Sequence, residues 1–263
     1  MADNFQNPTG IDAYKPAEIA ALVEASGAAK ARLGLVQLFT LAVLAGAFIA
    51  FGAAAFTMAM TGADLAFGPA RFFGGVVFSL GLILVIIGGA ELFTGNALMV
   101  MAAVDGLVTP SALMRNWAVV WCGNLAGALA LAFAIHLTGL LDGGFGDTAR
   151  KIAIAKAQLP AIEMFMRAVL CNVLVCLAVW LTIGARTAAG KILAIVWPIA
   201  TFVALGLEHS VANMFLLPQG MLAGAPIDLT AIARNLAITS LGNIAGGAGG
   251  VALSYRLAYG PRG

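Results

Sequence analysis

Long apolar stretches constrain the fold of this chain more than any other feature. A membrane-spanning helix needs about 20 apolar residues, and stretches of that length or more lie at residues 33–56, 72–104, 117–140, 161–183, 192–217 and 231–257. Charged residues make up 10% of the chain and hydrophobic residues 62%. Because so much apolar surface cannot be hidden from water, this composition excludes a soluble enzyme, a nucleic-acid-binding protein and a disordered chain. We therefore predict an all-α membrane protein with six transmembrane helices.

The segments that flank the spans are predicted to lie on one side of the membrane. Residues 1–32 form a tail and an amphipathic helix that starts at Pro16 and carries Ile19, Leu22 and Val23 on its apolar face. The six-span domain at 33–257 and a short tail at 258–263 follow. Both termini then share a side with eight lysines and arginines, against five on the other side and Arg167 inside the fourth span. This bias places both termini in the cytoplasm.

Two pairs of similar segments indicate an internal duplication. RNWAVVWCGNLAGA begins at Arg115 and RNLAITSLGNIAGG at Arg234, and seven of their fourteen positions are identical. ELFTGN begins at Glu91 and EHSVAN at Glu208, so that glutamate and asparagine match at both ends of the motif. Each unit, at about 33–140 and 161–257, holds three spans. Because three is odd, the second unit must run upside down, which makes a 3+3 inverted repeat.

The second motif pair interrupts the second and fifth spans. Irregular backbone is tolerated inside a membrane only where it lines a cavity or is buried in protein. We therefore predict that the two breaks meet near the midplane and mark a permeation site. The partial positive charge at the N-terminus of each second half-helix favours an anion there.

Several polar residues at the breaks are candidates for function. His209 is one of only two histidines, and an ionisable group at membrane depth is a functional candidate; the alternative is a neutral histidine bonded to a loop carbonyl. Thr94, in the opposite break, could donate its hydroxyl to a passing anion. Glu91 and Glu208 are interpreted as ligands of loop N–H groups that stay off the path, with proton transfer as the alternative.

The remaining polar residues have structural interpretations. Asn96 and Asn213 are predicted to cap the second half-helices. Asn172 is a lone amide in the fourth span. Lys156, just outside that span, is interpreted as a snorkelling interfacial lysine that could also gather anions at a pore mouth.

The sequence contains no pattern for catalysis or metal binding. Cys122, Cys171 and Cys176 all lie inside apolar runs without CxxC or Cys/His spacing, and we interpret them as small buried hydrophobes. There is no HExxH motif and no span with two aspartates, which argues against an intramembrane enzyme. Two distant histidines also argue against a haem-binding subunit of a respiratory complex. We predict no catalytic residues, metal or cofactor.

Three segments carry a resemblance to a known family: FSLGLILVIIGGAELFTGN at 78–96, LCNVLVCLAVW at 170–180 and FVALGLEHSVANMFLLP at 202–218. The chain resembles the formate/nitrite transporter family over nearly its whole length, and within it most the formate channels. The resemblance implies an aquaporin-like protomer, a homopentamer with one pore per protomer, and an amino-terminal helix that acts as a pH-dependent gate. It also implies polar pore residues at Thr94, Asn172 and His209 and a vestibule residue at Lys156. Apolar constrictions would be formed by Phe78, Leu82, Leu92, Phe93, Val175 and Phe202.

These observations predict a channel for small monovalent anions in a bacterial cytoplasmic membrane. Formate is the first candidate, and nitrite, hydrosulfide and acetate remain open. Apolar constrictions do not pass a bare charge cheaply. The anion must therefore be hydrogen-bonded by Thr94 and His209, or take a proton and cross as the neutral acid. The expected partners are the anion, protons, lipid and further copies of this chain, with no nucleic acid.

Overall fold

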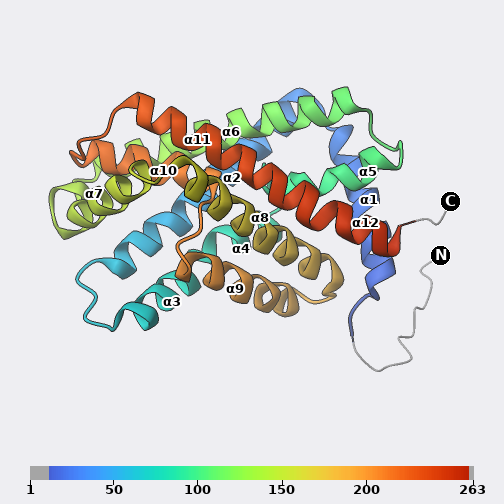
Figure 1. Ribbon diagram of the computed structural model, residues 1–263, viewed down its shortest axis with the longest axis horizontal. Coiled ribbons are helices and arrows are strands. Elements are labelled where there is room, and N and C mark those ends of the chain that lie inside the picture. Colours follow the sequence, from blue (N-terminus) through green and yellow to red (C-terminus); the bar gives the residue numbers. More distant parts are fainter. Residues whose placement is uncertain (1–11, 261–263) are drawn as a thin grey trace.

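The computed structural model describes residues 12–260, and within this range the regular elements are helices (Figure 1). One isolated antiparallel bridge joins Ala13 to Ala185. The outer parts of the predicted tails, residues 1–11 and 261–263, lie outside the described residues. The α-helices are α1 (Pro16–Ala31), α2 (Leu35–Met60), α3 (Phe67–Phe78), α4 (Leu80–Gly88), α5 (Val100–Val104), α6 (Pro110–Leu137), α7 (Gly144–Ala157), α8 (Ala161–Gly184), α9 (Ala188–Ala204), α10 (Ser210–Leu222), α11 (Leu229–Ile244) and α12 (Ser254–Tyr259). The 3-10 helices are η1 (Gly95–Met99) and η2 (Leu140–Asp142), and η3 (Ala245–Leu253) is a π-helix that joins α11 to α12.

Five helical segments in the described part of the chain are long and apolar enough to cross a membrane. They are Leu35–Met60, Phe67–Gly88, Pro110–Leu137, Ala161–Gly184 and Leu229–Tyr259. Two shorter apolar segments, Gly95–Val104 and Ala188–Ala204, accompany them. The predicted all-α class is therefore confirmed, and these lengths are those of a multi-pass membrane protein.

Helical structure stops inside two of the predicted apolar stretches. We call residues 89–94 the first loop, between α4 and η1, and residues 205–209 the second loop, between α9 and α10. Each helix ends at a glycine with positive φ, Gly89 at 78° and Gly206 at 69°. Glycine adopts this left-handed conformation without the steric cost that a Cβ would add, so both helices stop abruptly.

Close packing between long helices rests on glycines that lack a Cβ. Added to Gly127 of α6, a Cβ would overlap the Val43 carbonyl of α2, and one added to Gly246 of η3 would overlap the Val169 carbonyl of α8. In lipid, apolar burial gives little drive for helix association, so contacts between backbones at close range carry much of the stabilisation. The α2–α6 and α8–η3 pairs are thus packed in the same way.

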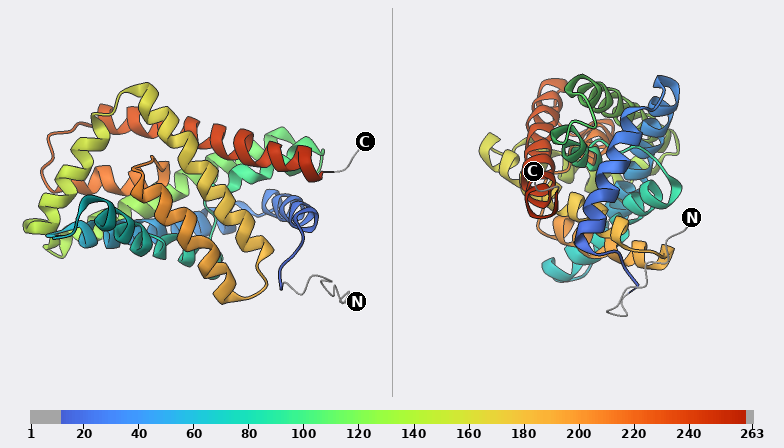
Figure 2. Two further views of the ribbon diagram at one scale, coloured as in Figure 1. Left: turned by 60° about the horizontal axis from the view of Figure 1, so that its bottom comes forward. Right: turned by 90° about the vertical axis from the view of Figure 1, so that its right-hand side faces the viewer.

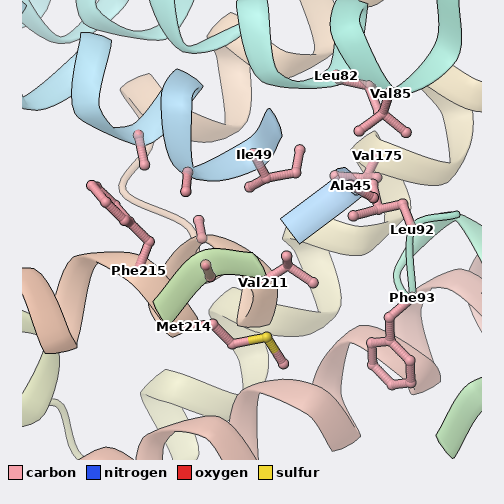
Figure 3. Close-up of a cluster of buried hydrophobic side chains, with 14 of the residues drawn as sticks. Ala45, Ile49, Leu82, Val85, Leu92, Phe93, Val175, Val211, Met214 and Phe215 are labelled. Carbon is pink, nitrogen blue, oxygen red and sulfur yellow. The ribbon is translucent and has the colours of Figure 1, made fainter. Parts of the chain in front are cut away.

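Buried apolar side chains fill the space between the helices and the two loops. Figure 3 shows Ala45 and Ile49 of α2 facing Leu82 and Val85 of α4, with Leu92 of the first loop and Val211 of α10 close by. These residues are all buried. The apolar core therefore fills the space between α2, α4, the first loop and the start of α10.

Two helices flank the bundle at opposite ends (Figures 1 and 2). The predicted amino-terminal helix is present as α1, and it packs on η1, α5 and α8 through Ile19, Val23 and Gly27. Of the predicted apolar face, Ile19 and Val23 are buried, whereas Leu22 is 39% exposed. At the other end lies α7, which the sequence analysis did not predict.

One further prediction needs correction. Cys122 is exposed on the outer surface of α6, whereas Cys171 and Cys176 are buried as expected. Arg167 lies, as predicted, inside the spanning segment Ala161–Gly184. It stands in the second turn of α8, where its guanidinium reaches the Gly206 carbonyl and the surface residue Glu163.

Candidate functional site

The two loops meet through one hydrogen bond in the centre of the molecule. Thr94 Oγ1 lies 2.9 Å from His209 Nε2, and the two residues are only 1% and 2% exposed. His209 Nδ1 accepts the Ala212 N–H at 3.1 Å and so caps the N-terminus of α10. An accepting Nδ1 carries no proton, so a neutral ring has its proton on Nε2 and donates it to Thr94. The Thr94 hydroxyl proton is then free to be donated to a third group.

This geometry requires a neutral His209. Protonation of Nδ1 would place two N–H groups face to face and remove the cap of α10. The interpretation of His209 as a ligand of a loop carbonyl was therefore wrong, because its partners are a hydroxyl and a backbone N–H.

A set of four side chains, which we call the first clamp, surrounds the first loop. Lys30 Nζ donates to Glu91 Oε1 at 2.7 Å and to Asn96 Oδ1 at 3.0 Å. Asn96 Nδ2 donates to Glu91 Oε2 at 2.8 Å and to Asn116 Oδ1 at 2.9 Å. The clamp therefore ties α1, the first loop, η1 and α6 together.

The second clamp repeats this pattern around the second loop. Lys156 Nζ donates to Glu208 Oε1 at 2.8 Å. Asn213 Nδ2 donates to Glu208 Oε2 at 2.6 Å and to Asn235 Oδ1 at 2.8 Å. Lys156 of α7 thus corresponds to Lys30 of α1, which makes α7 the counterpart of α1.

The clamps correct three predictions. Glu91 and Glu208 accept from lysine and asparagine side chains, not from loop N–H groups. Asn96 lies inside η1 and Asn213 inside α10, so neither is a helix cap. Lys156 does not snorkel to the surface, since its side chain is 16% exposed and ion-paired with Glu208.

Two further asparagines hold the loop backbones. Asn124 accepts the Phe93 N–H at 2.9 Å and donates to the Glu91 carbonyl at 3.0 Å. Asn243 makes the same pair of contacts with the Ser210 N–H, at 2.8 Å, and the Glu208 carbonyl, at 3.0 Å. Both asparagines lie in the duplicated RN…GN segments, but the sequence analysis used them only to recognise the repeat.

Asn172 of α8 supports the first loop from behind. Its Nδ2 donates to the Thr94 carbonyl at 3.2 Å and to the Asn243 carbonyl at 2.6 Å. Asn172 Oδ1 is buried and has no hydrogen-bond partner among the described residues. Asn172 therefore joins the backbone that carries Thr94 to the asparagine that fixes the second loop.

A cavity lies on each side of the Thr94–His209 pair. The larger, about 220 Å³, lies on the α7 side and is lined by His209, Phe78 and Phe202. The Phe78 and Phe202 rings meet edge to face with their centroids 5.5 Å apart, and Phe202 stacks on the His209 ring with a centroid distance of 5.9 Å. The smaller, about 50 Å³, lies on the α1 side and is lined by Leu82 and Leu92. Aromatic side chains thus flank His209 in the wall of the larger cavity, and aliphatic side chains line the smaller cavity on the other side of the pair.

The other two predicted constriction residues line neither cavity. Phe93 packs edge to face against Trp117 of α6 with ring centroids 6.5 Å apart, and Val175 is buried in the core beside Leu92 (Figure 3).

Three cationic side chains also line the larger cavity, and the sequence analysis had assigned only Lys156 to the pore. Arg71 of α3 and Arg167 of α8 line it together with Lys156. These residues are far apart in the sequence, and no motif connects them. Among residues 12–260 no group of three or more His, Cys, Asp or Glu side chains is placed to hold a metal ion.

Buried polar loops that meet in the centre of a helical membrane bundle, with a cavity on each side, are features of a membrane channel or transporter. The model of the family described as "Formate/nitrite transporter" matches residues 17–257. The chain belongs to this family, whose members are channels and transporters and not enzymes. The resemblance seen in the sequence is therefore confirmed.

Named relatives and solved structures are similar over most of their length. The "Formate channel FocA" of Escherichia coli (strain K12) is 36% identical over 94% of this chain and 95% of its own. The solved structure of a "Pentameric formate channel with formate bound" has a TM-score of 0.80 and 36% identity, covering 86% of this chain and 97% of that one. The solved structure of an "FNT family ion channel" has a TM-score of 0.86 and 30% identity, covering 92% and 98%.

Proposed function

We propose that this chain is a channel for small monovalent anions, with formate as the first substrate. The single observation that carries the proposal is the Thr94–His209 hydrogen bond between two cavities, because it offers hydrogen-bond donors where an anion would otherwise meet only apolar walls. The names of the similar proteins, which include formate, support the same substrate.

The proposed architecture is a six-span, aquaporin-like 3+3 inverted repeat with its halves at about 33–140 and 161–257. In this proposal α3, α4, η1 and α5 together make one interrupted span, and α9 with α10 makes another. The matching contacts of the two clamps support this assignment, since two copies of one unit would make them. Assembly as a homopentamer, with a pore in each protomer, is proposed from the similarity to a channel described as pentameric.

Orientation and location follow from charge. The first and last described helices, α1 and α12, lie side by side at the same end of the molecule (Figure 1). That end carries the larger share of lysine and arginine in the sequence, so we propose that both termini are cytoplasmic and that the protein resides in a bacterial cytoplasmic membrane.

The mechanism turns on the two donors of the central pair. An anion that reaches the narrow region loses water, and an unpaired charge there is costly. The Thr94 hydroxyl proton, which is free in the central pair, replaces part of that water, and the His209 Nε2–H adds to it when it shifts from Thr94 to the anion. Formate is also a weak acid, and its carboxylate can take a proton and cross the apolar walls as the neutral acid. Either route makes flux depend on pH, and Lys156 and Asn172 support it by holding the two loops in place.

The test is uptake of formate and of nitrite into proteoliposomes at two pH values. We expect formate uptake that rises at the lower pH in the parent protein, and an altered pH profile in His209→Gln with the oligomer still assembled. Nitrite passing faster than formate would make nitrite the main substrate. Equal flux and an unchanged pH profile in His209→Gln would reduce His209 to a structural cap.

A further inference from the structure

The larger cavity carries an excess of positive charge near Gly206. Arg71, Lys156 and Arg167 line it, and Glu208 is the one carboxylate among its lining residues. Glu208 is fully engaged by Lys156 and Asn213. Arg167 pairs at the surface with Glu163, 3.3 Å away, whereas Arg71 makes no ion pair with any described carboxylate and Glu208 is already taken.

The two guanidinium groups approach each other across Gly206. Arg71 Nη2 lies 3.1 Å, and Arg167 Nη1 3.9 Å, from the point where a Gly206 Cβ would stand. Arg71 Nη2 donates to the Val203 carbonyl at 2.8 Å, and Arg167 Nη1 to the Gly206 carbonyl at 3.5 Å. Two like charges so close repel each other unless an anion lies between them.

Arg71 also has an unused donor. Its Nε is buried and makes no hydrogen bond with any described residue, while the guanidinium lies over the Phe56 ring, 5.7 Å from the centroid. Buried N–H groups are normally satisfied. A guanidinium fork matches the two oxygens of a carboxylate, which would use this donor.

We propose that Arg71 and Arg167 form an outer binding site for a small carboxylate anion, which is filled before the anion reaches His209. The inference rests on the proposed function and adds to it the residues that collect the substrate on the α7 side. Because Phe78 and Phe202 line the same cavity, an anion held here is already next to the narrow region.

The flux test uses the full-length protein in bilayers, with formate added on the α7 side or on the α1 side. For formate on the α7 side, Arg71→Gln and Arg167→Gln should each raise the half-saturating concentration about fivefold, the effect of one unit charge about 4 Å away in a water-like dielectric. Arg71→Lys should recover part of this change. Maximal flux, and half-saturation from the α1 side, should stay as in the parent.

Arg150→Gln is the matched control. Arg150 lies at the same end of the molecule, on α7, but it pairs with Asp147 and the Ala223 carbonyl and does not line the cavity. An unchanged half-saturating concentration in both arginine variants, or an equal change from both sides, would overturn the site. So would an effect that appeared only in anionic lipid, since the arginines would then hold a lipid phosphate.

A binding measurement separates this proposal from the transport function. In detergent-solubilised protein, the resonance of isotope-labelled formate should broaden on binding. The broadening should be lost in the Arg71→Gln/Arg167→Gln double variant and kept in His209→Gln, whether or not the protein transports formate. Broadening that survives in the double variant and disappears in His209→Gln would place the only binding site at the central pair and contradict the proposal.

Discussion

The first and second loops are held by the same polar side chains but present different residues to each other. Lysine, glutamate and two asparagines make equivalent contacts in the two clamps, and Asn124 and Asn243 bind equivalent backbone atoms. When Glu91 is aligned with Glu208, however, Leu92 stands opposite His209 and Thr94 opposite Val211. Each half thus supplies one polar and one apolar residue, at different positions.

This difference shows how a duplicated scaffold can carry a site that is not duplicated. If both loops had histidine at the first position and threonine at the third, two titratable rings would share one buried space. Instead, one histidine meets one threonine, and their repeat counterparts, Leu92 and Val211, belong to the apolar core (Figure 3).

The two clamps also differ in burial. The Lys30 and Glu91 side chains are 29% and 9% exposed, whereas those of Lys156 and Glu208 are 16% and 3% exposed. Lys30 has a second side-chain acceptor in Asn96 Oδ1, whereas the equivalent atom, Asn213 Oδ1, is buried without a hydrogen-bond partner among the described residues. The second clamp is therefore less tolerant of change.

The largest expected effect concerns the packing that both halves share. Gly246→Leu should abolish folding, because any side chain at this position overlaps the Val169 carbonyl. Gly127→Leu should do the same in the first half. Gly249→Leu is the control, since no other atom approaches the position of its Cβ. Yield and monodispersity after detergent extraction measure the outcome, and a stable, monodisperse Gly246→Leu protein would show that this contact does not determine the fold.

The next largest effect is the loss of stability when the glutamate of each clamp is removed, which compares the two clamps directly. Glu208→Ala leaves Lys156 buried without its partner, and removal of one member of a buried ion pair costs about 3–5 kcal/mol. Glu91→Ala should cost less, because Lys30 is more exposed and keeps Asn96. Thermal unfolding in detergent compares the two, with Asp12→Ala, which breaks an exposed pair with Arg186, as a control worth at most about 1 kcal/mol. Equal losses at Glu91 and Glu208 would remove the distinction between the clamps.

The smallest expected effect is a pH dependence in the docking of α1, the counterpart of α7. Burial raises the pKa of Glu24, as do a hydrogen bond and repulsion from Asp105, while Arg256 opposes the shift. A raised pKa means that docked α1 binds the proton more tightly than undocked α1. Docking is therefore strengthened as pH falls and weakened as pH rises through the docked pKa. On α7 the carboxylate Asp147 pairs with Arg150 instead.

Hydrogen exchange of the α1 backbone amides at several pH values tests this prediction. Protection should increase toward acid pH in the parent, and Glu24→Gln should flatten the dependence. Glu18→Gln is the control, since Glu18 accepts the Lys15 N–H at the start of the same helix. A pH dependence that persists in Glu24→Gln would assign it to another group.

The sequence predicted the parts of this fold that depend on local pattern. Apolar length located α2 and α8 closely, and the repeated Glu…Asn spacing located both loops. It did not predict α7, because GFGDTARKIAIAKA is too short and too charged to read as a span, and its relation to α1 emerges only through Lys30 and Lys156.

The sequence predicted which residues belong to the site better than it predicted which residues they contact. His209 and Thr94 were identified because polar residues inside apolar stretches are rare. The partners of Glu91 and Glu208 were not, because each lysine comes from a separate helix outside the spans. Arg71 and Arg167 were missed as a pair for a different reason: both lie inside spanning segments and meet at Gly206 only after α3, α8 and α9 have packed together.

The most direct test of the central pair is a double-mutant cycle on formate flux with Thr94→Val, His209→Gln and the double variant. Flux is measured in proteoliposomes at matched protein content. If the two side chains act as one hydrogen-bonded unit, each single variant should lose about as much flux as the double variant, and the coupling should be large. Losses that simply add would mean that Thr94 and His209 act independently, which would contradict the central pair as the point where an anion crosses.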